Sequence, residues 1–288
     1  MRSSPTFGGF TRRDVLKGLA AVSVGTATGA AAHGYLYGRH NIDVTRTVLR
    51  VANLPDALAG LRIGFMTDLH RSSTVPHELI ESATGLLMRE QPDLIVLGGD
   101  YVTWGGDHRA TGDRYFVEPA ADAVRGLSAP HGVFGVLGNH DDDRSMPAAM
   151  ANRGVEILKD ARTRLTVRGE ALDLIGLRYW TTRSRDIASV ARGAAKASIL
   201  LAHNPSRLKE AAALSLPLML SGHTHGGQIV LPGLGAVAAR DFPIISGVGG
   251  RDRTTAFVSR GVGTVYVPIR INCPPEVALL TLQPSDLA

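Results

Sequence analysis

Short apolar runs alternate with amphipathic segments along most of this chain. Runs bounded by glycine or polar residues are typical of buried strands, and they occupy residues 61–67, 94–97, 133–137, 172–177, 198–202 and 218–221. Apolar residues at helical spacing predict helices over residues 76–89, 118–127, 187–196 and 206–213. This alternation predicts an α/β fold with helices packed on a largely parallel sheet.

The two ends of this region have a different pattern. Residues 44–49 alternate between apolar and polar side chains, as a half-exposed edge strand does. The C-terminal part is rich in strand signals with Gly/Pro connections, at residues 228–231, 257–259, 264–267 and 277–282. We expect this part to form a second sheet that packs against the first.

Polar side chains follow five of the predicted strands at the point where each strand ends. They are Asp68 and His70, Asp100, Asn139 with His140 and Asp141, His203, and His223 with His225. In open α/β sheets, ligands bind at the carboxyl ends of the strands. The sequence therefore predicts that these side chains gather at one site.

Each motif taken alone has a simpler interpretation. Gly138-Asn139-His140-Asp141 is also typical of a tight turn, and His203 alone is typical of a core histidine. His223 and His225 would point to opposite faces of an extended segment, so a glycine-flanked bend is needed to bring them together. It is the repetition at five successive strand ends that favours a functional site.

Composition excludes several classes of function. The chain has 288 residues with a formal charge of +5, but its first 32 residues carry +3 of this, so the rest is nearly neutral and has no basic cluster for nucleic acid. Cys273 is the only cysteine, which excludes an intramolecular disulfide and a thiolate-rich zinc site. We expect Cys273 to be structural.

The N-terminus is typical of an export signal. Arg12-Arg13 precedes an Ala/Gly/Val-rich stretch at residues 18–32 that ends in Ala30-Ala31-Ala32, a small-residue cleavage site. The segment resembles a bacterial twin-arginine signal, although Val15 stands where a Phe is commoner. The alternative is a basic helix start followed by an apolar helix.

This signal predicts two regions and a location. Residues 1–38 would be a twin-arginine signal peptide or an N-terminal membrane anchor, and residues 39–288 one main domain. Residues 18–38 are roughly long enough to span a bilayer, but their Gly/Ala/Thr content makes a weak span. We expect the twin-arginine machinery to export the protein to the periplasmic or cell-wall side, or to the outer face of the cytoplasmic membrane, with the membrane surface as a possible partner.

The motifs at the strand ends, in this order, resemble the calcineurin-like metallophosphoesterases over roughly residues 60–282, and most closely their exported bacterial branch. The resemblance implies a four-layer α/β/β/α sandwich with a dinuclear metal site at the strand ends. It further implies one metal held by Asp68, His70 and His225, a second held by Asn139, His203 and His223, and Asp100 as the bridge. Thr103 departs from the pattern, because many relatives have a charged residue there, and this casts doubt on a phosphate contact at that position.

The ligand types lead to the same chemistry. Imidazole, carboxylate and amide groups suit divalent Mn, Fe, Zn, Ni or Co. Two such cations, about 3.5–4 Å apart, activate water near neutral pH and stabilise both the attacking and the leaving oxygen at phosphorus. His140 is expected to act as general acid or to stabilise transition-state charge, with Asp141 orienting its ring. Arg71 would contact a phosphate oxygen or simply be solvated.

We therefore expect a dinuclear-metal-dependent hydrolase of a phosphodiester or pyrophosphate, acting on a cell-envelope or lipid-linked substrate. Tyr101, Trp104 and Tyr115 would form an apolar wall for an acyl or sugar group, or the loop that carries them would only pack on the domain. The alternatives are a phosphomonoesterase on a small soluble substrate and a UDP-acylglucosamine-type pyrophosphatase.

A metal-binding envelope protein without turnover is the rival class. His140 argues against it, because a site that only binds metal does not need this residue. No nucleic-acid partner is expected.

Overall fold

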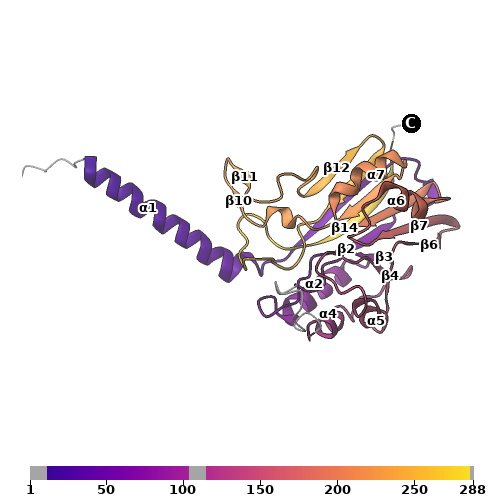
Figure 1. Ribbon diagram of the computed structural model, residues 1–288, viewed down its shortest axis with the longest axis horizontal. Coiled ribbons are helices and arrows are strands. Elements are labelled where there is room, and N and C mark those ends of the chain that lie inside the picture. The colour runs from indigo at the N-terminus through magenta and orange to yellow at the C-terminus, as the bar shows by residue number, and fades with distance from the viewer. Residues whose placement is uncertain (1–11, 104–114, 286–288) are drawn as a thin grey trace, which may run out of the picture.

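Two mixed sheets packed face to face form the body of the protein (Figure 1). The structure is a computed structural model that describes residues 12–103 and 115–285. The first sheet has the order β1 (Asp43–Val51), β14 (Glu276–Pro284), β2 (Arg62–Met66), β3 (Leu94–Leu97), β4 (Val133–Gly135) and β5 (Val155–Ile157). The second has the order β12 (Gly247–Arg251), β13 (Thr254–Val258), β9 (Leu218–Ser221), β8 (Ala197–Ala202), β7 (Glu170–Leu177) and β6 (Ala161–Val167).

Helices cover the outer face of each sheet. The apolar sides of α2 (His77–Arg89), α4 (Val117–Ala123) and α5 (Met146–Ala151) pack on the first sheet. Those of α6 (Ser184–Ala191) and α7 (Leu208–Ala213) pack on the second. A third core fills the space between the sheets, where the rings of Phe65 and Phe257 meet edge to face at 6.2 Å. The predicted α/β/β/α layering is thereby confirmed.

Strand direction brings the predicted site together. β2, β3 and β4 run parallel in the first sheet, and β7, β8, β9 and β13 run parallel in the second. The strand ends that carry polar residues therefore meet at one edge of the sandwich, as the carboxyl ends of parallel strands do.

The C-terminal strands match the expectation only in part, because β13 lies in the second sheet as expected and the others do not. β14 lies in the first sheet, parallel to β1 and antiparallel to β2, rather than in the second. Residues 264–267 form no strand, and residues 228–231 contribute only β10 (Val230–Leu231), which pairs with β11 (Gly235–Ala236). Short apolar runs have no preference for one sheet over the other, because the choice of partner depends on long-range packing.

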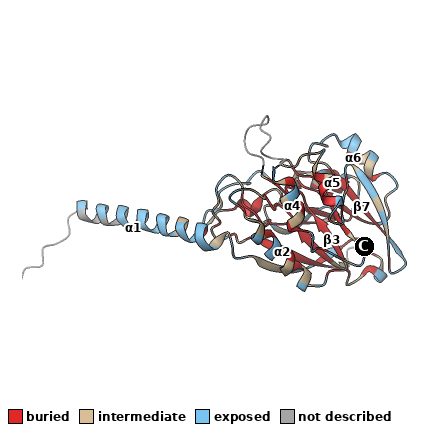
Figure 2. Ribbon diagram, turned by 90° about the horizontal axis from the view of Figure 1, so that it is seen from below, coloured by how far each residue is buried: buried red, intermediate tan, exposed pale blue. Residues whose placement is uncertain are grey.

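Helix α1 (Arg12–His33) stands away from the body, and Figure 2 shows it exposed along its length. A π-helical turn, Gly34–Gly38, connects it to the domain. In the part of the chain that the structure describes, no helix is long and apolar enough to cross a membrane.

Candidate metal centre and active site

Three overlapping groups of ligand atoms lie at the edge where the strands end. Within each group the atoms lie within 4.8 Å of one another, and the groups are Asp68–His70–His225, His70–Asp100–His140 and Asp100–His203–His223. Asn139 lines the same cavity. The structure thus brings together every residue that the sequence analysis named as a ligand.

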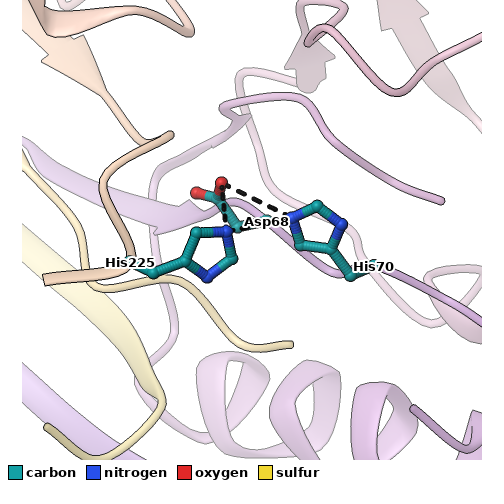
Figure 3. A group of neighbouring side chains, drawn as sticks. All are labelled: Asp68, His70 and His225. Carbon is teal, nitrogen blue, oxygen red and sulfur yellow. Dashed lines mark hydrogen bonds and ion pairs between the residues drawn. The ribbon is translucent and has the colours of Figure 1, made fainter. Parts of the chain in front are cut away.

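The first group joins the end of β2 to the loop after β9, and Figure 3 shows its three side chains converging. Nε2 of His70 lies 3.0 Å from Nε2 of His225, which in turn lies 3.3 Å from Oδ1 of Asp68. Both imidazoles therefore direct the same nitrogen towards one carboxylate oxygen.

Asp100 lies between this group and the histidines of the second sheet. Its Oδ2 is 3.1 Å from Nε2 of His203 and 3.6 Å from Nε2 of His70. His203 follows β8 and His70 follows β2, so this one carboxylate contacts ligand candidates from both sheets.

Neighbouring groups fix the orientation of the histidine rings. His203 donates from Nδ1 to the carbonyl of Gly98 at 2.8 Å, which leaves Nε2 facing the site. The Thr103 hydroxyl donates to the backbone carbonyl of His70 at 3.2 Å, so its oxygen can accept a hydrogen from Nδ1 of the same residue, 3.1 Å away. Thr103 therefore positions His70, a role that sequence reasoning missed.

Burial keeps several of these rings neutral. It lowers the pKa of His70 to about 3 and that of His223 to about 4, and it lowers the pKa of His225 well below the usual value. A neutral imidazole keeps the lone pair that a metal ion requires.

The carboxylates respond differently to the same burial. Burial raises the pKa of Asp68 to about 6, and the nearby charge of Asp100 adds to this effect. Burial also opposes ionisation of Asp100, but the charge and hydrogen bond of His203 outweigh it and hold the pKa of Asp100 well below its usual range. Asp100 is therefore the permanent negative charge of the site.

The residues present fit divalent metal ions. Oδ1 of Asn139 and Nδ1 of His225 are buried and have no hydrogen-bond partner in the described part of the chain. Buried polar atoms normally have partners, so an acceptor oxygen left without one among imidazoles and carboxylates is a ready metal ligand. Mixed nitrogen and oxygen donors of this kind match the chemistry of Mn, Fe, Zn, Ni or Co.

Backbone strain also occurs at this site. Five of the seven candidate ligands have positive φ, namely Asp68, His70, Asp100, His223 and His225. Left-handed backbone is uncommon outside glycine and gathers at functional sites, where the surrounding structure holds it in place. The neighbouring Gly138 and Gly222 have no room for a Cβ, which would collide with the side chains of Asp100 and Asp68.

His140 and Asp141 lie beside the ligands. The backbone N–H of His140 donates to Oδ1 of Asp100 at 2.9 Å, and its ring lies edge to face with that of His70, with centroids 5.1 Å apart. The carboxylate of Asp141 accepts hydrogen bonds from the backbone N–H groups of Gly138, Asp100 and Tyr101 at 2.7–2.8 Å. Asp141 therefore ties the loops after β3 and β4 together, and its expected effect on the His140 ring stays a prediction.

The aromatic residues at the site are not the expected ones. Tyr101 is fully buried in the core, so the proposal that it forms a wall for substrate is wrong, and Trp104 lies outside the described residues. Tyr179 and Phe242 instead place their rings 5.3 Å and 5.2 Å from the ring of His223. Tyr179 closely follows the predicted strand at 172–177. The expectation that functional side chains follow strand ends, which identified the histidines, therefore also applies to Tyr179.

Arg71 faces away from the ligands. Its guanidinium donates to the backbone carbonyls of Ser72 and Val75 and lies over the ring of Phe116, 4.9 Å from the centroid. It lines a different cavity, next to α2 and α4. These contacts give Arg71 a structural role in the loop after β2.

A cavity of about 350 Å³ opens over the candidate ligands. Part of its lining is polar and carries His70, Asp100, Asn139, His140, His223 and His225. The lining also has a largely apolar part, with Ile229, Val237, Phe242, Val265, Tyr266 and Val267. The cavity can therefore hold a charged group against the ligands and an apolar or sugar group against the apolar part.

Comparison with known proteins identifies relatives of this site. The family model described as calcineurin-like phosphoesterase matches residues 61–227, the segment that carries all the candidate ligands. The chain is 31% identical to phosphodiesterase YaeI of Escherichia coli over 242 residues, which is 81% of this chain and 86% of the relative. It is 28% identical to YkuE of Bacillus subtilis, an uncharacterized metallophosphoesterase, over 96% of this chain and 99% of the relative.

Solved structures show more distant similarity. The NAD nucleotidase of Haemophilus influenzae aligns with a TM-score of 0.48 and 13% identity, covering 70% of this chain and 45% of that one. This chain therefore spans less than half of the nucleotidase.

Proposed function

We start from the fact that this chain belongs to the calcineurin-like phosphoesterase family, and we propose that it cleaves a phosphodiester or pyrophosphate of the cell envelope. The chain is a metal-dependent phosphoester hydrolase, as its family and its phosphodiesterase relative establish. One observation supports the proposed envelope substrate. Candidate ligands from both sheets converge on Asp100, beside a cavity with polar and apolar lining residues.

The proposal assigns the ligands to two cations. Asp68, His70 and His225 would hold one, and Asn139, His203 and His223 the other. Asp100 would contact both, because it lies between His70 and His203. When bound, the cations activate water and stabilise negative charge on the phosphoryl oxygens.

The chain's own residues complete the reaction. His140 faces the cavity from a backbone that Asp100 fixes, so its ring can deliver a proton to the leaving oxygen. Asp141 keeps that backbone in place through the hydrogen bonds it accepts from the backbone N–H groups of Gly138, Asp100 and Tyr101. Thr103 and the Gly98 carbonyl hold the rings of His70 and His203 in their orientation.

The apolar wall supports a substrate with an acyl or sugar group next to its phosphate. Tyr179 and Phe242 flank His223, where they can stack on such a group. A phosphomonoesterase on a small soluble substrate is the alternative, and a UDP-acylglucosamine-type pyrophosphatase also fits this cavity. A metal-binding protein without turnover is the remote alternative, and it leaves His140 without a role.

Location is part of the proposal. Arg12 and Arg13 begin the exposed helix α1, which supports export by the twin-arginine machinery to the periplasmic or cell-wall side or the outer face of the membrane. Replacing both arginines by lysine is expected to keep the protein in the cytoplasm when cell fractions are compared. Continued export of that variant would contradict this part of the proposal.

Metal analysis and a substrate panel test the activity. We expect the purified full chain to contain divalent metal and to hydrolyse an aryl phosphodiester. Lipid-linked phosphodiesters and pyrophosphates should give higher kcat/KM than the same head groups without chains. Equal kcat/KM with and without chains would contradict a lipid-linked substrate. A preference for phosphomonoesters would favour a phosphomonoesterase on a small soluble substrate.

A further inference from the structure

Exposed apolar side chains occur at the base of α1, on the β10–β11 hairpin and at the site cavity. We call this set the apolar collar, and it consists of Leu36, Tyr37, Leu231, Leu234, Val237, Tyr266 and Val267. Leu234 is 71% exposed and Tyr266 is 92% exposed. Isolated exposed apolar residues are normal in proteins, but a contiguous patch marks an interaction surface.

The β10–β11 hairpin links two cavities that collar residues line. Leu36, Tyr37 and Leu231 line a groove of about 1220 Å³ at the base of α1. Val237, Tyr266 and Val267 line the site cavity. The β10–β11 hairpin connects the two, because Leu231, Leu234 and Val237 lie on it or directly next to it, and Figure 1 shows it at the end of the body from which α1 leaves.

The collar is also free of acidic residues. The three segments that form it, residues 34–42, 229–240 and 262–274, contain no Asp or Glu. Arg240 is exposed and donates to the carbonyls of Ala236 and Leu234, which fixes its charge beside the hairpin tip. Arg39 lies over the ring of Tyr35, 4.3 Å from the centroid. Within these three segments, positive charge and apolar side chains thus occur together, and the nearest acidic residues in the sequence are Asp43 and Asp241, directly after two of the segments.

We propose that the apolar collar docks on an anionic lipid bilayer and places the mouth of the site cavity at the membrane surface. Aliphatic and aromatic side chains with flanking arginines are the composition of membrane-interface segments, and anionic lipids attract the arginines. A second copy of the chain is a poorer occupant, because a two-fold interface would bring the same cationic patches together.

Docking in this way determines how substrate reaches the site. Val237, Tyr266 and Val267 belong both to the collar and to the wall of the site cavity. A phosphoester attached to a lipid can then enter the cavity while its chains stay in the bilayer. The identity of that substrate rests on the proposed function, whereas docking itself does not.

Leu234→Trp in the full chain tests the docking of the hairpin directly. With phosphatidylglycerol vesicles, we expect its emission to shift to the blue after subtraction of the wild-type spectrum, and with phosphatidylcholine vesicles we expect no shift. Val48→Trp is the matched control, because Val48 is 55% exposed on the edge strand β1, outside the collar, and it should show no shift. A negative charge at the hairpin tip, Leu234→Glu, should weaken vesicle binding about tenfold, and Val48→Glu should not.

Three outcomes would overturn the proposal. Vesicle binding with no shift for Leu234→Trp would show that α1 alone attaches the protein. Equal shifts at positions 48 and 234 would show nonspecific adsorption, and a shift that depends on protein concentration without vesicles would show self-association. None of these measurements needs turnover, so hydrolysis of a soluble aryl phosphodiester by the wild type tests the proposed function separately.

Discussion

Buried carboxylates of this protein are neutralised in two different ways. Asp173, on β7 in the second sheet, is fully buried. Its carboxylate accepts hydrogen bonds from Arg162 and Arg164 at 2.6–2.9 Å and from the backbone N–H of Ala195 at 2.8 Å. This carboxylate therefore has permanent positive charges next to it.

Asp68 and Asp100 are equally buried but have no such charges. Within residues 12–103 and 115–285, neither forms an ion pair with Arg or Lys, and their partners are imidazoles, backbone N–H groups and one hydroxyl. Burying two ionised carboxylates side by side is costly, and the charge of His203 lowers the pKa of Asp100 but leaves that of Asp68 raised. Imidazole nitrogens can donate lone pairs to a cation, which guanidinium groups cannot. The first arrangement is therefore structural, and the second is suited to a cation that binds from solution.

The largest effect is expected when Asp100→Asn, at the candidate metal site, is compared with Asp173→Asn, at the structural carboxylate. Removing the charge of Asp100 should lower kcat on an aryl phosphodiester by several orders of magnitude, because this carboxylate is the proposed contact of both cations. Asp173→Asn should lower the free energy of unfolding by about 2 kcal/mol, since it removes the charge with which Arg162 and Arg164 pair, and should keep kcat per folded molecule. Full activity of the Asp100 variant, or activity that survives exhaustive chelation, would refute the metal mechanism.

A second test separates proton transfer from metal binding. His140→Ala should keep its metal content and lower kcat roughly 10²–10⁴-fold, the range for a lost general acid. The loss should shrink for a substrate whose leaving group needs no proton. Steady-state rates over a series of leaving groups, with metal content measured in parallel, check this. Equal losses across the series would assign His140 to charge stabilisation instead.

The sequence predicted most of the candidate site because strand ends can be read from local patterns. A buried apolar run followed by Asp, Asn or His, as in residues 61–70 and 198–203, locates the strand and the side chain at its end together. The layering also followed from the resemblance of these motifs to a known family. What the pattern could not give was the partner of each strand, so β14 was expected in the wrong sheet.

Features that depend on contacts between distant segments were missed. Thr103 positions His70 from 33 residues away, and Phe242 reaches His223 from a loop without a strand signal. Tyr101 follows a predicted ligand, but its ring points into the core, and no local pattern distinguishes these two directions. The positive φ angles at the ligands are likewise imposed by the fold, since Asp and His adopt many backbone conformations.

A third test uses stability rather than turnover. If cations neutralise Asp68 and Asp100, adding Mn²⁺ at about 100 times its Kd should raise the free energy of unfolding of the metal-free wild type by about 2.7 kcal/mol per site. The gain should be retained in Asp173→Asn and largely lost in Asp100→Asn. Thermal or denaturant unfolding with and without metal measures it. An equal gain in both variants would show that the cation binds elsewhere.

The smallest expected effect concerns the structural carboxylate and its response to acid. Burial alone would raise the pKa of Asp173, but the hydrogen bonds from Arg164, Ala195 and Arg162 outweigh it and lower this pKa to about 2. Because the carboxyl in the unfolded chain has a pKa near its usual value of about 3.9, the ionised form contributes about 2 kcal/mol of stability above that pH. The contribution is lost as the pH falls towards 2.

Denaturant unfolding of wild type and Asp173→Asn at pH 7 and pH 3 isolates the stability that the ionised Asp173 carboxylate contributes. The difference in unfolding free energy between them should shrink by about 1 kcal/mol at pH 3, where part of the contribution is already lost. Other acidic groups titrate in both proteins and largely cancel in the difference. A gap that is unchanged between the two pH values would mean that Asp173 acts through packing rather than through its charge, and the contrast with the metal site would then rest on the kinetic tests alone.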